Sequence, residues 1–165
     1  MKREVPHGLA LRAVLSCFYY AAVLDWAFDL NLLRWAYLPL PEWVSWVGLG
    51  SFALVVALFW WIHLTLGANY HGPLLLHDGH QLVTSGPYAL VRHPTYTTFA
   101  LMHLSVMLLT SSWLVGVSGL IMSGYVNYRR VQYEESLLLA RFGDRYAEYA
   151  ATTGRWLPKL RRGRD

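Results

Sequence analysis

One polar stretch of this chain gathers residue types that could do chemistry, and long apolar runs stand on both sides of it. The stretch runs from His80 to Tyr96 and contains two histidines, two tyrosines, an arginine, a glycine and two prolines. Gly86 would let a ligand approach the backbone closely, and Pro87 fixes the φ angle that follows. The alternative is that Gly-Pro and His-Pro only punctuate a loop, and these residues taken alone leave both interpretations open.

The end of this stretch predicts a position suited to an anion. His93 precedes Pro94, which biases His93 toward extended backbone, and Pro94 suits the first position of a helix. His93 is therefore expected at a helix N-terminus, where backbone N–H groups and the helix dipole favour negative charge. A carboxylate or a phosphate of a cofactor would fit there.

A second charged group follows the last apolar run and reads Arg129-Arg130-Val131-Gln132-Tyr133-Glu134-Glu135. One interpretation is a solvated helix face, because a pair four residues apart contributes only about 0.2–0.5 kcal/mol. The other is a ligand site, since adjacent carboxylates are costly to place next to a membrane span. The carboxylates could hold ribose hydroxyls or a ligand ammonium, and an arginine could hold a substrate carboxylate or phosphate.

Other chemistries find less support in the sequence. His71, His77 and His80 suggest a metal site, but no cysteine or carboxylate set completes one, and no metal is expected. His63 and His103 lie within apolar runs and are expected to be partnered residues of a helix-bundle interior. The chain has no Ser/His/Asp set, Walker loop or Rossmann fingerprint.

The composition indicates which elements must position these residues. The chain has 165 residues, enough for one domain, and is 55% hydrophobic but only 15% charged, which predicts an integral membrane protein. Eight Trp and eleven Tyr suit membrane interfaces. The net charge of +4 is assigned to contact with anionic lipid rather than nucleic acid. The single cysteine, Cys17, allows no internal disulfide.

Four apolar runs predict about four transmembrane helices, because about 20 residues cross a hydrocarbon core of about 30 Å. They extend from about Leu9 to Leu30, Trp43 to Leu66, Thr95 or Tyr96 to Thr110, and Trp113 to Tyr128. The amphipathic pattern from Arg129 to Thr152 predicts an interfacial or cytosolic helix, with Gly143 as a possible interruption. The predicted fold is an all-α polytopic membrane helical bundle with a cytosolic loop over residues 67–95, in one domain over 1–165.

Basic residues predict the orientation of this bundle. Lys2 and Arg3 precede the first run, and Arg129 and Arg130 follow the fourth. The positive-inside rule then places both termini in the cytosol, with the 67–95 loop and the 129–152 helix on the same face. The first run lacks a small-residue cleavage site after it and is expected to be a retained span.

Three motifs, taken in order, resemble the isoprenylcysteine carboxyl methyltransferase family. They are Leu66-Gly67-Ala68-Asn69, then His80-x-Leu82-Val83-Thr84-x-Gly86-Pro87-Tyr88-x-x-Val91-Arg92-His93-Pro94-x-Tyr96, and then Glu134-Glu135 followed by Phe142-Gly143-x-x-Tyr146-x-x-Tyr149. These small membrane enzymes form a superfamily with the phosphatidylethanolamine N-methyltransferases. The resemblance covers about residues 66–158, and the order and spacing of the motifs make it specific.

The resemblance implies S-adenosylmethionine as the cofactor and a cofactor-binding core over residues 67–158. The apolar runs place two spans in residues 1–66, and the basic residues near the end predict a basic tail over 159–165. The resemblance also implies that the cofactor is contacted by His80, Leu82, Val83, Gly86, Tyr88, His93, Pro94, Tyr96 and Glu135. It places Arg129 or Arg130, together with Glu134, where cofactor and acceptor meet. A carboxylate or thiolate acceptor needs little acid–base help, so proximity and exclusion of water would supply most of the acceleration.

The acceptor stays open among a carboxylate, an amine and a thiol. Because the chain has fewer spans than the eukaryotic carboxyl methyltransferases, a small lipophilic acceptor is expected in place of a prenylated protein, in a bacterial or archaeal cytoplasmic membrane. Two alternatives remain: a membrane reductase of the sterol-reductase type that uses NADPH, and a non-catalytic membrane protein. The sequence does not indicate the oligomeric state.

Overall fold

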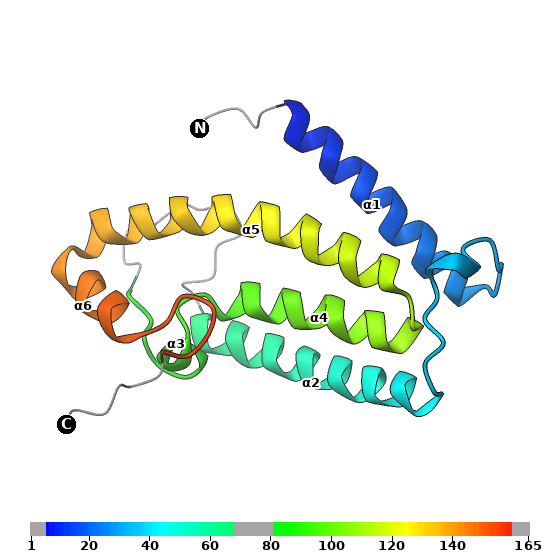
Figure 1. Cartoon of the computed structure of the whole chain (residues 1–165). Helices are drawn as coiled ribbons and strands as arrows, with labels where there is room; N and C mark the ends of the chain where they lie inside the picture. Colours follow the sequence, from blue (N-terminus) through cyan, green and yellow to red (C-terminus); the bar gives the residue numbers. More distant parts are fainter. Residues whose placement is uncertain (1–5, 68–80, 160–165) are drawn as a thin grey trace, which may run out of the picture. The chain divides into compact units, whose positions relative to one another are not determined.

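The computed structural model describes residues 6–67 and 81–159 (Figure 1). Within these two ranges the regular elements are helices, so the all-α prediction is confirmed for this part of the chain. In order, they are α1 (Pro6–Ala27), the 3-10 helix η1 (Arg34–Ala36), α2 (Trp43–Leu66), α3 (Pro87–Leu90), α4 (Pro94–Thr110), α5 (Trp113–Phe142) and α6 (Asp144–Thr152).

Among the described residues, two helices are long and apolar enough to cross a membrane, within Ala10–Ala27 and Trp43–Leu66. A core helix of a soluble protein can have the same length and composition, but it is mostly buried. Here only 11% and 17% of the residues of these windows are buried within the chain, so most of their apolar side chains face outward. Helix α4 has 17 residues and α5 carries charges in its second half, and the predicted count of four spans stays a prediction.

The helix limits follow the apolar runs with two exceptions, since α1 spans Pro6–Ala27 instead of about Leu9 to Leu30, and α5 extends well past Tyr128. Helix α2 has the predicted bounds, and Pro94 opens α4 as expected. The prediction of a separate amphipathic helix from Arg129 is wrong, because α5 continues without a break from Trp113 to Phe142. No glycine or proline interrupts residues 125–142, and the break comes at Gly143, whose φ of +53° suits a residue without a Cβ.

The chain forms two compact units, one from Met1–Val55 with Phe99–Val126 and one from Val56–Thr98 with Asn127–Asp165. In the first unit, glycines let helices approach closely. A Cβ on Gly116 would collide with Met107, and one on Gly119 would collide with the His103 ring. Close contact between membrane helices commonly depends on such small residues. Gly116 and Gly119 therefore set the packing of α5 against α4.

His103 lies inside the first unit, with 4% of its surface exposed and its ring edge-on to Tyr19 at 5.4 Å between centroids. The predicted interior position is confirmed. Its Nδ1 has no hydrogen-bond partner among the described residues, so the expected partner stays a prediction.

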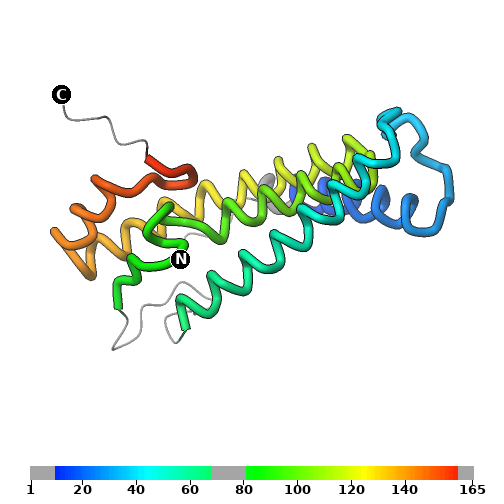
Figure 2. The backbone as a smooth tube through the Cα atoms, turned by 90° about the horizontal axis from the view of Figure 1, so that it is seen from below, coloured from blue at the N-terminus to red at the C-terminus, as the bar shows by residue number. Residues whose placement is uncertain are grey.

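A buried carboxylate orders the connection between α1 and α2, which Figure 2 shows as the blue-to-cyan end of the tube. Asp25 is 2% exposed and accepts hydrogen bonds from the backbone N–H of Leu32 at 2.8 Å and from the Tyr37 hydroxyl at 2.9 Å. The Leu38 N–H donates to the Ser111 carbonyl at 2.7 Å. The Asp25 bonds hold the connection to the end of α1, and the Leu38 bond ties it to the turn between α4 and α5.

Candidate functional site

The site begins with a tight turn ahead of α3. Gly86 has φ +57° and ψ −131°, and the Tyr88 N–H donates to the Ser85 carbonyl at 3.1 Å. These angles are those of the first central residue of a type II′ turn, a position that favours glycine. A Cβ on Gly86 would lie 3.1 Å from Oγ1 and 3.2 Å from Cγ2 of Thr65 at the end of α2. The glycine thus serves the turn and its packing against α2.

The next turn, between α3 and α4, pairs with the segment that follows α6. Val91 and Gly154 form a parallel bridge, the Arg92 N–H donates to the Gly154 carbonyl at 2.8 Å, and the His93 N–H donates to the Arg155 carbonyl at 3.1 Å. The backbone N–H of His93 is therefore already bonded within the protein. The side chain of His93, and not its N–H, is the part that the site can use.

The carboxylate of Glu135 on α5 is surrounded by donors from two arginines and one histidine. Its Oε1 accepts from Nε and Nη2 of Arg92 at 3.2 and 3.0 Å, from Nε of Arg155 at 3.1 Å and from Nε2 of His93 at 3.2 Å. Its Oε2 accepts from Nη2 of Arg155. Burial alone would raise the pKa of Glu135, but the bonds from Arg155 and Arg92 outweigh it, and the pKa lies below its usual value. Glu135 is thus an ionised carboxylate whose oxygens are occupied by protein donors.

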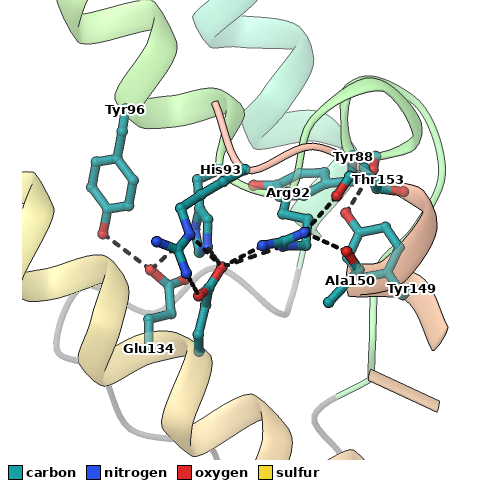
Figure 3. A network of polar contacts seen from close by, with 10 residues as sticks. Tyr88, Arg92, His93, Tyr96, Glu134, Tyr149, Ala150 and Thr153 are labelled. Carbon is teal, nitrogen blue, oxygen red and sulfur yellow. Dashed lines mark hydrogen bonds and ion pairs between the residues drawn. The ribbon is translucent and has the colours of Figure 1, made fainter. Parts of the chain in front are cut away.

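Glu134 has a different environment, although it is the next residue along α5. Its Oε2 accepts from the Tyr96 hydroxyl at 3.1 Å and lies 3.7 Å from Nδ1 of His93, and 34% of its side chain is exposed (Figure 3). Glu134 is therefore the carboxylate of the pair that a ligand can reach.

The imidazole of His93 lies between the two carboxylates and is 4% exposed. Burial lowers its pKa from the usual 6.5, although Glu134 and Glu135 act in the opposite direction. The ring is therefore neutral at pH 7 and carries one N–H. The contact with Glu135 assigns this N–H to Nε2, which leaves Nδ1 as an acceptor on the side of Glu134.

The chain from α6 to residue 156 lies along the same turns (Figure 3). Nη1 of Arg92 donates to the carbonyl of Ala150 at 2.8 Å and to that of Thr153. The Tyr149 hydroxyl donates to the Tyr88 carbonyl at 2.6 Å. Burial raises the pKa of Tyr149 to about 12, so this hydroxyl keeps its proton. Three segments of the second unit thus meet at Arg92.

The structure brings together four of the residues that the sequence singled out, His93, Tyr96, Glu134 and Glu135. Other predicted residues shape the turns or lie near them. Gly86, Tyr88 and Pro94 form the two turns, Leu82 and Val83 are half-buried just before them, and Arg129 and Arg130 are exposed on α5. His80, and with it the histidines His71 and His77 weighed as metal ligands, lies outside the described residues.

Two residues of the network were missed. Arg92 lies in the motif, but the sequence alone indicates no role for it. Arg155 lay in no motif, and only its charge close to a predicted membrane face could have drawn attention to it.

Comparisons with known proteins point in one direction. The model of the isoprenylcysteine carboxyl methyltransferase (ICMT) family matches residues 46–140. A probable protein-S-isoprenylcysteine O-methyltransferase of Oryza sativa subsp. japonica is 30% identical over 117 residues, which are 70% of this chain and 61% of the relative. The protein-S-isoprenylcysteine O-methyltransferase of Homo sapiens is 30% identical over 168 residues, which are 94% of this chain and 57% of the relative.

A solved structure is also similar. The eukaryotic intramembrane Ras methyltransferase ICMT superposes with a TM-score of 0.74 at 24% identity, over 88% of this chain and 52% of that one. At this identity the likeness shows the fold. The chain spans about three-fifths of the length of the curated relatives or less. These relatives are eukaryotic and lend no support to the predicted bacterial or archaeal source.

Proposed function

Because the chain belongs to the isoprenylcysteine carboxyl methyltransferase family, we propose that it transfers a methyl group from S-adenosylmethionine to a lipophilic acceptor at a membrane face. One observation carries the proposal. The turn at His93 and Pro94 meets the carboxylate pair of α5, and one of these carboxylates, Glu134, keeps part of its surface open beside Tyr96. Tyr96 and Glu134, which are 38 residues apart and belong to the two motifs that imply cofactor binding, are thus in contact.

The residues of this site fit the cofactor's chemistry. S-adenosylmethionine carries hydroxyls and an ammonium, which are donors, and an aromatic base. Glu134 and the unprotonated Nδ1 of His93 are acceptors for such donors. The rings of Tyr88 and Tyr96 and the apolar side chains of Leu82 and Val83 suit the base. By family resemblance His80, Gly86, Pro94 and Glu135 complete the predicted set.

The cofactor supplies an electrophilic methyl group bonded to a sulfonium. The work left to this chain is to bind, orient and exclude water. An ionised carboxylate acceptor attacks without losing a proton, so the site needs no general base. Glu135, held between Arg92 and Arg155, is a poor base, which agrees with that requirement. Arg129 or Arg130 would hold the acceptor's carboxylate.

We further propose that the acceptor is the terminal carboxylate of an isoprenylated cysteine, in place of the small acceptor expected from the number of spans. The names of the curated relatives support this choice, since they are protein-S-isoprenylcysteine O-methyltransferases. The outward-facing apolar side chains of α1 and α2 suit a site whose acceptor reaches it through lipid. A free carboxylate also matches a site with arginines and without a base.

The test uses the full chain in lipid nanodiscs. Calorimetry with S-adenosylhomocysteine measures cofactor binding, and transfer of a labelled methyl group to an S-farnesylated cysteine measures activity. The same compound with its carboxylate amidated is the matched control. Binding together with methylation of the free carboxylate alone supports both proposals. Methylation of an amine or thiol instead would overturn the acceptor, and absence of binding with hydride transfer from NADPH would overturn the reaction.

Glu134→Gln is the variant that tests the site. It keeps the size of the side chain but removes the negative charge beside Tyr96. We expect cofactor affinity to fall by roughly tenfold to a hundredfold, since hydrogen bonds to charged groups contribute about 1.5–3 kcal/mol. Arg145→Ala, an exposed change on α6, is the control. Equal affinity of Glu134→Gln and the unchanged protein would remove Glu134 from the site.

A further inference from the structure

The segment that follows α6 is held against the predicted cofactor motif by bonds from several directions. The Arg92 and His93 N–H groups donate to the carbonyls of Gly154 and Arg155. Thr97 Oγ1, one turn into α4, donates to the carbonyl of Trp156 at 2.9 Å. Together with the bonds from Nη1 of Arg92 to Ala150 and Thr153, these contacts fix Ala150–Trp156 along the turn that carries His93.

Gly154 makes the close path of this segment feasible. A Cβ there would collide with the carbonyl of Leu157 and would lie 3.1 Å from the N atom of Lys159. Both neighbours are backbone atoms, so they cannot move aside as a flexible side chain could. The backbone therefore turns tightly between Gly154 and Lys159. The side chain of Arg155, the next residue, lies against Glu135 of α5.

Arg155 is the one residue of this segment whose side chain, among the described residues, forms an ion pair with α5. Its Nε and Nη2 bind the two oxygens of Glu135 as a fork. The same Oε1 that accepts from Nε of Arg155 also accepts from Nε2 of His93. A fork of this kind fixes the rotation of a carboxylate as well as its position. Arg155 binds both oxygens of Glu135, whereas Arg92 binds Oε1 alone, so Arg155 adds the contact that fixes the rotation of the carboxylate to which His93 Nε2 is bonded.

We propose that Ala150–Trp156 is a part of the cofactor site and that Arg155 is a positioning residue, which acts through Glu135 to fix the orientation and the single N–H of His93. The proposal rests on the proposed function for the identity of the ligand. It changes the role predicted for Glu135. With its oxygens bonded to Arg92, Arg155 and His93, Glu135 serves the site by holding His93, and Glu134 is the carboxylate that meets the cofactor.

A merely structural role for Arg155 would be to tie down the end of the chain. The two roles differ in what they do to His93. The charged and titratable groups that face its ring are Glu134 and Glu135 on α5, Arg92 beside it, Tyr96 on α4, and Arg155 through Glu135. Removal of the Arg155 charge leaves Glu135 less neutralised, so Glu135 attracts a proton on His93 more strongly. The pKa of His93 must then rise.

The experiment compares four proteins in detergent micelles: the unchanged chain, Arg155→Gln, Arg155→Lys and Arg145→Ala. Since 41% of the Arg155 side chain is exposed, its replacement leaves the buried core intact. NMR of histidine-labelled protein follows the titration of His93, assigned with His93→Gln. Calorimetry from pH 5.5 to 8 follows the Kd of S-adenosylhomocysteine. Should Arg155→Gln fail to fold, Arg155→Met, which keeps an apolar stem, takes its place.

We expect the titration midpoint of His93 to move up in Arg155→Gln. The Kd at pH 7 should rise by roughly threefold to tenfold, which lies between the effects of losing an exposed ion pair and a buried charged hydrogen bond. The pH below which binding weakens should also move to a higher value. Arg155→Lys keeps the charge and should restore most of both effects. Arg145→Ala removes an equal charge from a residue of α6 outside the network and should change neither.

An unchanged His93 midpoint in Arg155→Gln would overturn the proposal, whatever happens to affinity. A raised midpoint with an unchanged Kd and pH profile would overturn the part played by the segment in cofactor binding. The NMR arm needs no ligand. If the unchanged protein does not bind S-adenosylhomocysteine while the midpoint still moves, the proposed cofactor is wrong and the coupling of Arg155 to His93 stands.

Discussion

Arg92→Ala is the substitution whose effect on stability can be worked out most directly. The Arg92 side chain is 11% exposed. It makes two bonds to Glu135 Oε1, at 3.2 and 3.0 Å, and two through Nη1 to the carbonyls of Ala150 and Thr153. Alanine removes all four bonds. The three partner residues, Glu135, Ala150 and Thr153, then lose their link to the turn between α3 and α4.

The magnitude follows from what each partner keeps. Removing one member of a buried ion pair costs about 3–5 kcal/mol when the other is left alone, but Glu135 retains Arg155 and His93. We therefore assign about 1.5–2 kcal/mol to the lost charged bonds and about 1 kcal/mol to the two carbonyls together. A loss of about 3 kcal/mol lowers Tm by roughly 6–12 °C in a chain of this size.

The assay is thermal unfolding in one detergent at one scan rate, followed by the fluorescence of the eight tryptophans. A fixed scan rate is needed because irreversible unfolding makes Tm depend on it. Arg92→Lys keeps the charge without the planar fork, so its Tm should fall by about half as much as that of Arg92→Ala. Arg141→Ala changes an exposed residue at the end of α5 and is the control, and its Tm should equal that of the unchanged protein. A drop of less than about 2 °C in Arg92→Ala would refute the reasoning.

Three further predictions concern stability. Asp25→Asn replaces one of the two acceptor oxygens by an NH2 group, so Leu32 N–H and the Tyr37 hydroxyl no longer both donate to this side chain, and the free energy of unfolding should fall by about 1–3 kcal/mol; an unchanged Tm would show that these bonds contribute little. Gly86→Ala should cost about 1–3 kcal/mol, because a φ of +57° strains any residue with a Cβ; full stability there would mean that the turn rearranges freely. Acid should destabilise the fold. In the unfolded chain His93 has a pKa of about 6.5, and in the folded chain its pKa is lower. The unfolded chain therefore binds the proton first, and the free energy of unfolding decreases as pH falls below about 6.5. Glu135, whose folded pKa lies below 4.5, adds a second loss below that pH; His93→Gln should remove the first loss alone, and a melt profile identical to that of the unchanged protein would contradict this.

The sequence predicted the helices where a run of apolar residues has clear ends. Helix α2 is such a case, with Glu42 before it and Gly67 after it. The prediction of helix limits was less reliable after Tyr128, where the composition changes from apolar to charged but no residue breaks the helix. A helix can continue from an apolar into a polar sequence without a break in its backbone. Helix α5 does so and ends only before Gly143, which has a positive φ.

The site was predictable to the level of which motifs meet. Tyr96 and Glu134 come together as the resemblance implied. The sequence did not predict that Glu135 is bonded to protein donors while Glu134 stays partly exposed. Adjacent residues of a helix point in different directions, and the groups around each side chain depend on the tertiary structure. Arg155 lies 20 residues beyond Glu135, and its contact depends on the reversal of the chain between them, which periodicity does not reveal.

The order of the segments along the chain has a consequence for biosynthesis. Arg92 can bond to the Thr153 carbonyl only after the 61 residues that separate them have been synthesised. At about 5–20 residues per second, the ribosome needs roughly 3–12 s to add these residues. During that interval the apolar helices have been made, while Glu135, once synthesised, still lacks Arg155. A nascent chain therefore enters the membrane with its ion-pair network open, and a premature stop shortly before Gly154 would leave a product whose helices are complete and whose site is not.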